Sequence, residues 1–385
     1  MTEADLAMPD SPVAPPSIYD RLHGKAAHVP VTLLLIGANL LVFGLMLGNG
    51  AGLWHAQNSI QLAWGANFGP ATQDGQWWRL GSALFLHFGL IHLTMNLWAL
   101  WDGGQLVERM FGHLRFIIIY LASGLCGNLL SLVIQGNEAV SGGASGAIFG
   151  VYGALLVFVW RERQQLNPGE FRWLFWGGLG FSAVSITLGL IIPGIDNSAH
   201  IGGLIAGCLL GMLFGRALTT PSPWRWQDRI FSGSLLAGGI IYLATHIPPP
   251  AYRWSDELAA RQEISQFLSE EVGIQTKWQD IIRQDRERSL SLDQLATRVE
   301  SEITEYYDDS LEQLSQLQIS PAAPSAATIE SLRTYTEKRR DTSQALANQL
   351  RAQGQFGPKR ANSGKTELVK PAPSLQTGNA EAKDD

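Results

Sequence analysis

Long apolar runs separated by short polar connections fill the first 250 residues of this 385-residue chain. A helix needs about 20 mostly apolar residues to cross the hydrocarbon core of a bilayer. Seven runs reach or approach this length, although the seventh has a weakly hydrophobic interior. They lie near residues 31–47, 80–101, 114–134, 144–160, 173–192, 199–215 and 230–246. We therefore expect an all-α polytopic membrane protein with seven transmembrane helices.

The charged residues gather after the seventh run. Of 34 acidic residues 22 lie beyond residue 249, as do 17 of the 28 basic residues. Apolar residues spaced by three and four in this tail predict a helix from about 250 to 317 and a second over 329–353, separated by a Pro/Ala/Ser break. The predicted divisions are an N-terminal segment 1–30, a six-helix core 31–217, a seventh transmembrane helix 229–247, a helical soluble tail 250–353 and a disordered C-terminus 354–385.

Basic residues in short loops indicate the orientation, because Lys and Arg are enriched in cytoplasmic loops. Arg161 and Arg172 follow the fourth run, whereas the loops 135–143 and 193–198 contain no Lys or Arg. This asymmetry predicts a cytoplasmic N-terminus and an extracytoplasmic tail. Residues 1–30 contain no signal-peptide pattern, and their acidity argues against a mitochondrial transit peptide. A bacterial plasma membrane fits the short acidic N-terminus best.

Several other classes of protein are disfavoured by the composition. No basic patch exceeds what loops at a membrane surface require, so we do not expect nucleic acid as a partner. Cys126 and Cys208 both lie inside apolar runs, and neither a CxxC pair nor an HExxH motif occurs. We therefore expect no metal, no cofactor and no disulfide framework.

Ser145 and His200 lie near the predicted outer ends of the fourth and sixth runs. Polar side chains inside a membrane are costly unless they face one another, so they indicate a site. A serine hydroxyl becomes an effective nucleophile when a neutral histidine removes its proton. Glycines at four-residue spacing, among them Gly146 on the first helix and Gly203 and Gly207 on the second, allow two helices to approach closely. The pattern favours a Ser-His dyad, and glycine packing without chemistry is the alternative.

His92 and Asn96 are four residues apart and therefore lie on one helical face. A histidine N–H and an asparagine amide could stabilise the negative oxygen of a tetrahedral intermediate, with the backbone N–H of Ser145 as a third donor. The alternative is that both residues form hydrogen bonds between helices. Asp196 is close to His200 in sequence, but it lies in a short outer loop that solvent could reach, so we do not expect it to orient the histidine.

Residues 31–216 resemble the rhomboid family of intramembrane serine proteases. The motifs that carry the resemblance are Trp78-Arg79, His87 with His92-x-x-x-Asn96, Glu108-x-x-x-Gly112, Gly143-x-Ser145-Gly146 and Ala199-His200-x-x-Gly203-x-x-x-Gly207. All five occur in the family's order and spacing. The seventh helix resembles the six-plus-one arrangement found in part of that family.

The resemblance implies roles for individual residues. Ser145 would be the nucleophile and His200 the general base, without an acidic third member. His92, Asn96 and the Ser145 amide would form the oxyanion hole, and Gly143 would support the serine. Some family members have a tyrosine at the position of Phe149 that stacks against the histidine, and phenylalanine keeps that stacking surface.

The implied activity is cleavage of single-span membrane proteins near the outer membrane face, with membrane lipids as the surroundings. One alternative is an inactive relative that binds membrane-protein clients. Another is a transporter or channel, which predicts ionisable residues at mid-depth, and the fourth to sixth runs contain none except His200 near one end. The tail could bind a protein partner or serve as a solvated spacer, and both readings stay open.

Overall fold

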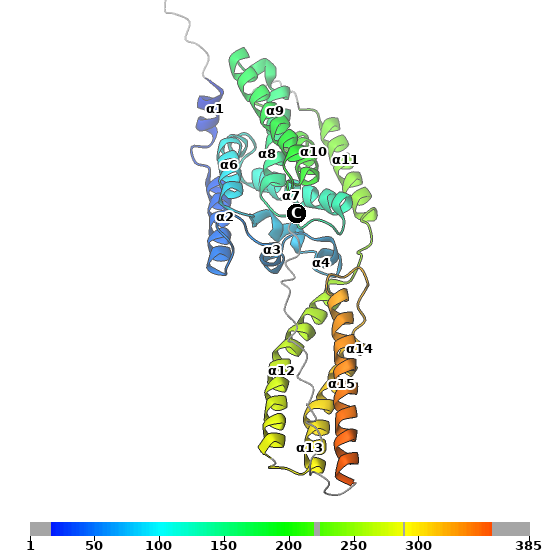
Figure 1. Cartoon of the computed structure of the whole chain (residues 1–385). Helices are drawn as coiled ribbons and strands as arrows, with labels where there is room; N and C mark the ends of the chain where they lie inside the picture. The colour runs from blue at the N-terminus through cyan, green and yellow to red at the C-terminus, as the bar shows by residue number, and fades with distance from the viewer. Residues whose placement is uncertain (1–16, 219–223, 288, 356–385) are drawn as a thin grey trace, which may run out of the picture. The chain divides into compact units, whose positions relative to one another are not determined.

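The computed structural model describes residues 17–218, 224–287 and 289–355, and every regular element in these ranges is a helix (Figure 1). The chain divides into two compact units, Met1–Pro250 and Ala251–Asp385. The disorder predicted for residues 354–385 falls almost entirely outside the described ranges. The fold is that of an all-helical, multi-pass membrane protein.

The first unit contains the apolar helices. Its elements are α1 (Ile18–Lys25), α2 (Pro30–Gly48), α3 (Asn58–Trp64), α4 (Gly69–Gln73), α5 (Arg79–Ser82), η1 (Ala83–Phe85), α6 (Leu90–Phe111), α7 (His113–Gln135), α8 (Ser145–Arg161), η2 (Arg163–Gln165), α9 (Pro168–Ile191), α10 (Asn197–Phe214) and α11 (Trp226–Thr245). Helix α1, which the sequence analysis did not predict, packs Ile18 and Leu22 into the core.

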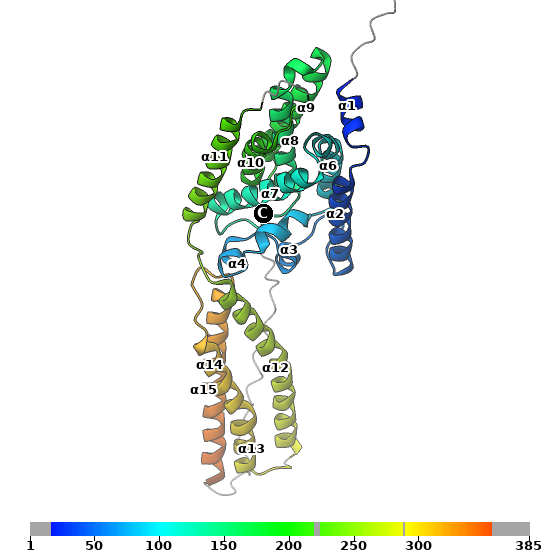
Figure 2. The same cartoon turned by 180° about the vertical axis from the view of Figure 1, so that it is seen from behind.

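Length and hydropathy identify four of the described helices as long and apolar enough to cross a membrane: α2, α7, α9 and α10. The pair formed by residues 79–85 and α6 makes a fifth if it counts as one bent span, and α8, with 17 residues, is shorter than the others. Helix α11 lies beside α10 (Figure 2) but is not among these spans. The arrangement of six helices plus one remains a prediction.

The helix predicted near residues 80–101 is interrupted in the structure. The chain bends by 92° between Phe85 and Leu90, and α6 then continues to Phe111. The connection pairs with an earlier loop: the Leu90 N–H donates to the Leu53 carbonyl at 2.8 Å. A side chain at Gly89 would collide with the backbone carbonyl of Trp54, so glycine permits this close approach.

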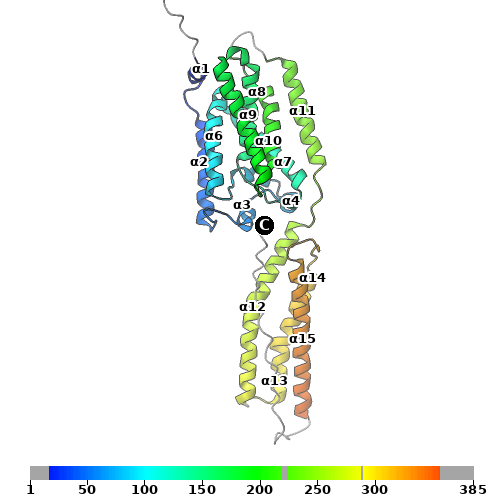
Figure 3. The ribbon, with the colours of Figure 1, turned by 45° about the horizontal axis from the view of Figure 1, so that its top comes forward.

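Helix α8 is the centre of the membrane unit. Most of its residues are buried, and α6, α7, α9 and α10 pack around it (Figure 3). Large side chains such as Tyr120 of α7 and Phe158 of α8 fill this core. Exposed leucine and tryptophan residues cover α2 and α9, as expected for helices that face lipid. Helix α8 is therefore held in place by four neighbouring helices.

Glu108, near the end of α6, caps the beginning of α2. Its buried carboxylate accepts hydrogen bonds from the Val31 N–H at 3.0 Å, from the Thr32 N–H at 2.8 Å and from the Thr32 hydroxyl at 2.6 Å. The His113 Nδ1 atom lies 2.6 Å from the carboxylate oxygen that accepts from Val31. Because the first N–H groups of a helix have no partner inside the helix, this carboxylate fixes α2 against α6.

Replacing Glu108 with glutamine is expected to destabilise the membrane unit by about 2–3 kcal/mol, because the amide N–H₂ group would face either the Val31 N–H or the donors of Thr32 and leave buried donors unsatisfied. Thermal unfolding in detergent measures the change. Glu138→Gln, at an exposed glutamate, is the matched control and should leave the unfolding temperature unchanged. Equal effects of the two substitutions would contradict the capping role.

The second unit is a helical bundle of its own. It contains α12 (Trp254–Glu287), α13 (Leu292–Val299), the π-helical turn η3 (Glu300–Thr304), α14 (Glu305–Gln316) and α15 (Ala326–Gln355). The prediction of one helix from 250 to 317 is wrong, because a new helix begins after Ser291. The Ser291 hydroxyl accepts from the Gln294 N–H, and the Gln294 side chain accepts from the Ser291 N–H, which is a capping box.

A buried polar cluster joins three helices of this bundle. Glu271 of α12 accepts hydrogen bonds from the hydroxyls of Tyr307 at 3.0 Å and Tyr335 at 2.7 Å. Burial raises the pKa of Tyr335 to about 12, so its hydroxyl keeps the proton that it donates. The Arg339 guanidinium lies over both tyrosine rings and donates to the Tyr307 oxygen. The cluster fixes α12 against α14 and α15.

Candidate active site

Ser145 and His200 meet at the ends of two packed helices. Ser145 is the first residue of α8, and His200 lies in the first turn of α10. The His200 Nε2 atom lies 2.8 Å from the Ser145 Oγ atom, which is hydrogen-bond distance. His200 is buried, with 7% of its surface exposed, and Ser145 is half-buried. The two residues therefore have the separation needed for proton transfer from serine to histidine.

Glycines bring the two helices into backbone contact. A Cβ atom added to Gly203 would overlap the Gly146 carbonyl oxygen, and one added to Gly207 would overlap the backbone of Gly150. One turn further along, a side chain at Gly211 would lie 2.8 Å from the Ala154 Cα atom. This row of close contacts fixes α10 against α8 along its length, and so sets the register of His200 beside Ser145.

Phe149 holds the plane of the His200 ring. The two rings are stacked, with centroids 4.4 Å apart and planes 8° from parallel. Phe181 of α9 packs behind Phe149 with a centroid distance of 6.0 Å. Phe149 lies one turn after Ser145, so the helix that carries the serine also orients the histidine.

The second ring nitrogen of His200 is buried and has no hydrogen-bond partner among the described residues. Because Nε2 faces the serine hydroxyl, a neutral ring that accepts the serine proton carries its own proton on Nδ1. No carboxylate in the described ranges accepts that proton. Among the described residues, the pair of Ser145 and His200 therefore has no acidic third member.

Gly143 and His92 line the space beside the serine. Gly143 has a φ of 144°, in the range that favours glycine, and a Cβ atom there would lie 3.0 Å from His92 Nε2. The Phe88 N–H approaches the His92 Nδ1 atom at 3.5 Å, so Nδ1 is the acceptor and Nε2 carries the proton in the neutral ring. The N–H of His92 is thus directed toward the segment that leads to Ser145.

Asn96 is buried one turn below His92. Its amide nitrogen donates to the His92 carbonyl oxygen at 2.9 Å. An asparagine amide has two N–H groups, so one remains for another acceptor. The N–H groups of the first turn of α8 provide further donors, because Ala144 makes no side-chain cap there.

The first loop is braced next to this site. Arg79 is buried and donates to the carbonyl oxygens of Leu62 at 2.7 Å and Ala66 at 3.1 Å. Its guanidinium also lies 4.9 Å from the centre of the Trp78 ring. His87 is fully buried with its ring edge toward His92, at 5.1 Å between centroids. These contacts fix the segment that leads into α6.

The Asp196 carboxylate is hydrogen-bonded within the protein rather than left to solvent. Its carboxylate accepts hydrogen bonds from Ser131 and Gln135 of α7, from Ser141 of the following loop and from the Ala199 N–H. The sequence does not predict the contacts with Ser131 and Ser141, because both serines are distant from Asp196 in sequence and no motif marks them. The signal available in the sequence was the position of Asp196, four residues before the candidate base His200.

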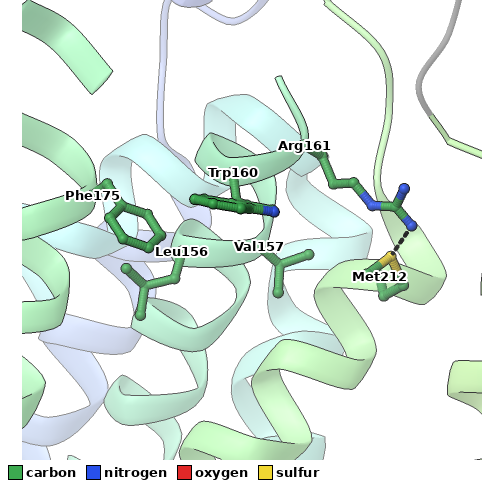
Figure 4. Close-up of a pocket in the computed structure, with 6 residues that line it drawn as sticks. All are labelled: Leu156, Val157, Trp160, Arg161, Phe175 and Met212. Carbon is green, nitrogen blue, oxygen red and sulfur yellow. Dashed lines mark hydrogen bonds between the residues drawn. The ribbon is translucent and has the colours of Figure 1, made fainter. Parts of the chain in front are cut away.

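A cavity of about 310 Å³ lies at the other end of α8, away from the dyad (Figure 4). Its walls are mostly apolar, and Arg161 closes one side with a contact to the Met212 sulfur. The lining residues are Leu156, Val157, Trp160, Arg161, Phe175 and Met212. Because Ser145 is at the opposite end of the same 17-residue helix, this cavity does not serve the candidate chemistry.

Comparison with known proteins agrees with these features. The Rhomboid domain family matches residues 74–217. "Rhomboid protease GluP" of Bacillus subtilis is 35% identical over 242 residues, which cover 62% of this chain and 44% of that protein. "Putative rhomboid protease YdcA" of the same organism is 34% identical over 149 residues, 39% of this chain and 72% of that protein. "RHOMBOID-like protein 7" of Arabidopsis thaliana is 35% identical over 187 residues, 47% of this chain and 53% of that protein. The chain thus spans about half the length of several curated relatives that it matches.

Proposed function

This chain belongs to the rhomboid family, and we propose that it is an intramembrane serine endopeptidase that works through a dyad of Ser145 and His200. The observation that carries the proposal is the 2.8 Å separation of Ser145 Oγ and His200 Nε2. His200 takes the hydroxyl proton while the serine oxygen attacks a peptide carbonyl. It then returns the proton to the leaving amine. Water hydrolyses the acyl-enzyme in a second, equivalent step.

The oxyanion of the tetrahedral intermediate is stabilised by His92, Asn96 and the Ser145 amide. Support comes from the protonated Nε2 of His92 beside Gly143 and from the spare N–H of Asn96. Donors aimed at the developing charge lower the barrier more than donors that bind the ground-state carbonyl. The negative charge forms next to the first turn of α8, where the helix dipole also favours an anion.

The proposed substrates are single-span membrane proteins cut near the outer membrane face. A helical peptide bond is shielded by its own hydrogen bonds, so cleavage requires a segment that unwinds, such as one with glycine or proline. We further propose the orientation with a cytoplasmic N-terminus and an outer tail in a bacterial plasma membrane, supported by the basic residues of alternate loops. Six core helices and α11 then make seven spans.

The test is cleavage of single-span reporter proteins in liposomes with the full-length chain. The reporters differ in the placement of a Gly-Pro pair along the span, and mass spectrometry identifies the new termini. The proposal predicts cuts near one face that require the destabilised segment and disappear with Ser145→Ala. Intact reporters that bind equally to the wild type and to Ser145→Ala would instead favour the alternative, a rhomboid-like protein that holds membrane-protein clients without cutting them.

Phe149→Leu is expected to lower the cleavage rate about 3- to 10-fold, because a stacked ring pair contributes about 0.5–1.5 kcal/mol beyond its area. The reason is looser orientation of the His200 ring rather than loss of a reacting group. Steady-state cleavage of the best reporter measures the effect as a fall in kcat. Phe171→Leu, at a half-buried ring outside the site, is the control, and equal losses in both variants would contradict the orienting role.

A further inference from the structure

Asp196 is the N-cap of α10, but it binds more than its own helix. One carboxylate oxygen accepts from the Ala199 N–H at 3.0 Å, which is the capping bond. The other oxygen accepts from the hydroxyls of Ser131 at 2.5 Å and Ser141 at 2.6 Å. The amide of Gln135 adds a fourth donor at 3.3 Å. A carboxylate has about four acceptor positions, so this one is fully used.

These donors come from three different elements. Ser131 belongs to α7, Ser141 to the connection that leads into α8, and Ala199 to the first turn of α10. The two O–H···O distances fall in the range of charge-assisted hydrogen bonds. Both serines are buried, at 3% and 7% exposure. The carboxylate therefore joins the segment that carries the nucleophile to the helix that carries the base.

The contact acts at the end of α10 that follows an exposed turn. An exposed turn at Pro193 and Gly194 precedes the helix, and Gly194 has a positive φ of 83°. His200 follows within one turn, and its N–H donates to the Asp196 carbonyl oxygen at 3.2 Å. Any shift of Asp196 is thus transmitted directly to the backbone of His200.

The connection before α8 is fixed at Ser141 and at Gly143. The Ser141 backbone exchanges two 2.8 Å hydrogen bonds with Asn67, and the Gly143 N–H donates to the Ala83 carbonyl at 2.8 Å. Ser141 is therefore an anchored point four residues before Ser145. A carboxylate held by Ser141 takes its position from the segment that holds the nucleophile.

From this geometry we propose that Asp196 is a positioning residue, which holds His200 at bonding distance from Ser145 by linking α10 to α7 and to the loop before α8. The inference rests on the proposed function. Asp196 does not hydrogen-bond the imidazole itself, because both of its oxygens are occupied and His200 Nδ1 has no partner among the described residues. If Asp196 only capped α10, it would need one side-chain oxygen, and a Ser or Asn side chain would cap the helix equally well.

Two variants distinguish the role of Asp196 as a link between elements from its role as the N-cap of α10. Asp196→Ser keeps a hydroxyl that caps Ala199 but is too short to hold both serines. The double variant Ser131→Ala/Ser141→Ala keeps the whole cap and removes two donors. Misplacement of a reacting group by about 1 Å can cost about 100-fold in rate, so we expect kcat to fall between about 10- and 100-fold in both variants with KM unchanged. Combining them should add little, because both break the same link.

Ser182→Ala is the matched control, since within the described ranges this buried hydroxyl bonds only the Gly178 carbonyl of its own helix at 2.9 Å. It should keep the wild-type kcat. A double variant with wild-type kcat, or an Asp196→Ser variant that regains full activity, would overturn the positioning role and leave Asp196 as a simple cap.

Hydrogen exchange decides the inference independently of activity. In the double serine variant the peptide covering residues 197–203 should exchange faster than in the wild type, although its cap is untouched. Unchanged protection there would overturn the proposal. If the wild type cleaves no reporter, the proposed function fails, and the exchange measurement still supports or refutes the link made by Asp196.

Discussion

His200→Ala is expected to lower reporter cleavage by at least about 10³-fold, because a serine without its base is a poor nucleophile and the dyad acts as a unit. For the same reason, the double variant Ser145→Ala/His200→Ala should be no slower than either single variant. The measurement is single-turnover cleavage of the best reporter in liposomes. Unfolding temperatures of all variants accompany it, so that a loss of folding is not mistaken for a loss of chemistry.

His23→Ala is the matched control for this prediction. His23 is an exposed histidine on α1, and its replacement should leave cleavage unchanged. A His200→Ala variant that cleaves within tenfold of the wild type, while Ser145→Ala is inactive, would show that another group removes the serine proton. The dyad would then be wrong even though serine catalysis stood.

Gly203→Ala is expected to cause the second large effect. The added methyl group would overlap the Gly146 carbonyl oxygen, so α8 and α10 must separate. Overpacking of a rigid contact costs about 1–3 kcal/mol or more, and the shift also moves His200 away from Ser145. We expect a lower unfolding temperature together with a fall in kcat of about 100-fold for each 1 Å of displacement.

The control is Gly177→Ala in α9, where nothing lies within 4 Å of the added atom. Alanine favours a helix over glycine, so this variant should be neutral or slightly more stable. Thermal unfolding and reporter cleavage are measured on both variants in parallel. If Gly203→Ala behaves like Gly177→Ala, the glycine contacts do not set the position of the dyad.

The sequence predicts the helices well because their signal is local. Runs of apolar residues and flanking charges place α2, α7, α9 and α10 within a few residues of their observed bounds. The bend before α6 was missed for the opposite reason. Apolar residues continue through it, and the cause is a contact of Gly89 with a loop more than 30 residues earlier, which no local pattern reveals.

In the candidate site, too, local sequence signals predict the residues, whereas contacts between distant residues depend on the fold. A motif predicts Ser145 and His200 as partners, but their 2.8 Å separation depends on glycines that meet across two helices. Phe149 could be placed beside His200 because both the helical spacing and the family resemblance pointed there. The hydrogen bonds of Asp196 depend on serines 55 and 65 residues away in sequence, so only the fold brings them together.

In the bundle after Pro250, the sequence likewise predicts the local structure but not the point at which one helix ends and the next begins. Its helical character is predicted by spacing, whereas the break before Leu292 is set by a two-residue exchange of hydrogen bonds between Ser291 and Gln294. A capping box was readable in the sequence at this point, and the continuous apolar spacing concealed it. Binding of a protein partner by this unit stays a prediction, and binding experiments with the 385-residue chain test it.

Labelling with a serine-directed fluorophosphonate tests the central claim most directly. The full-length protein in detergent is treated with the probe, and mass spectrometry maps the modified residue. An activated dyad predicts an adduct on Ser145 in the wild type that is absent in Ser145→Ala and lost in His200→Ala. A folded wild-type protein that takes up no probe, or takes it up at a serine other than Ser145, would contradict the account.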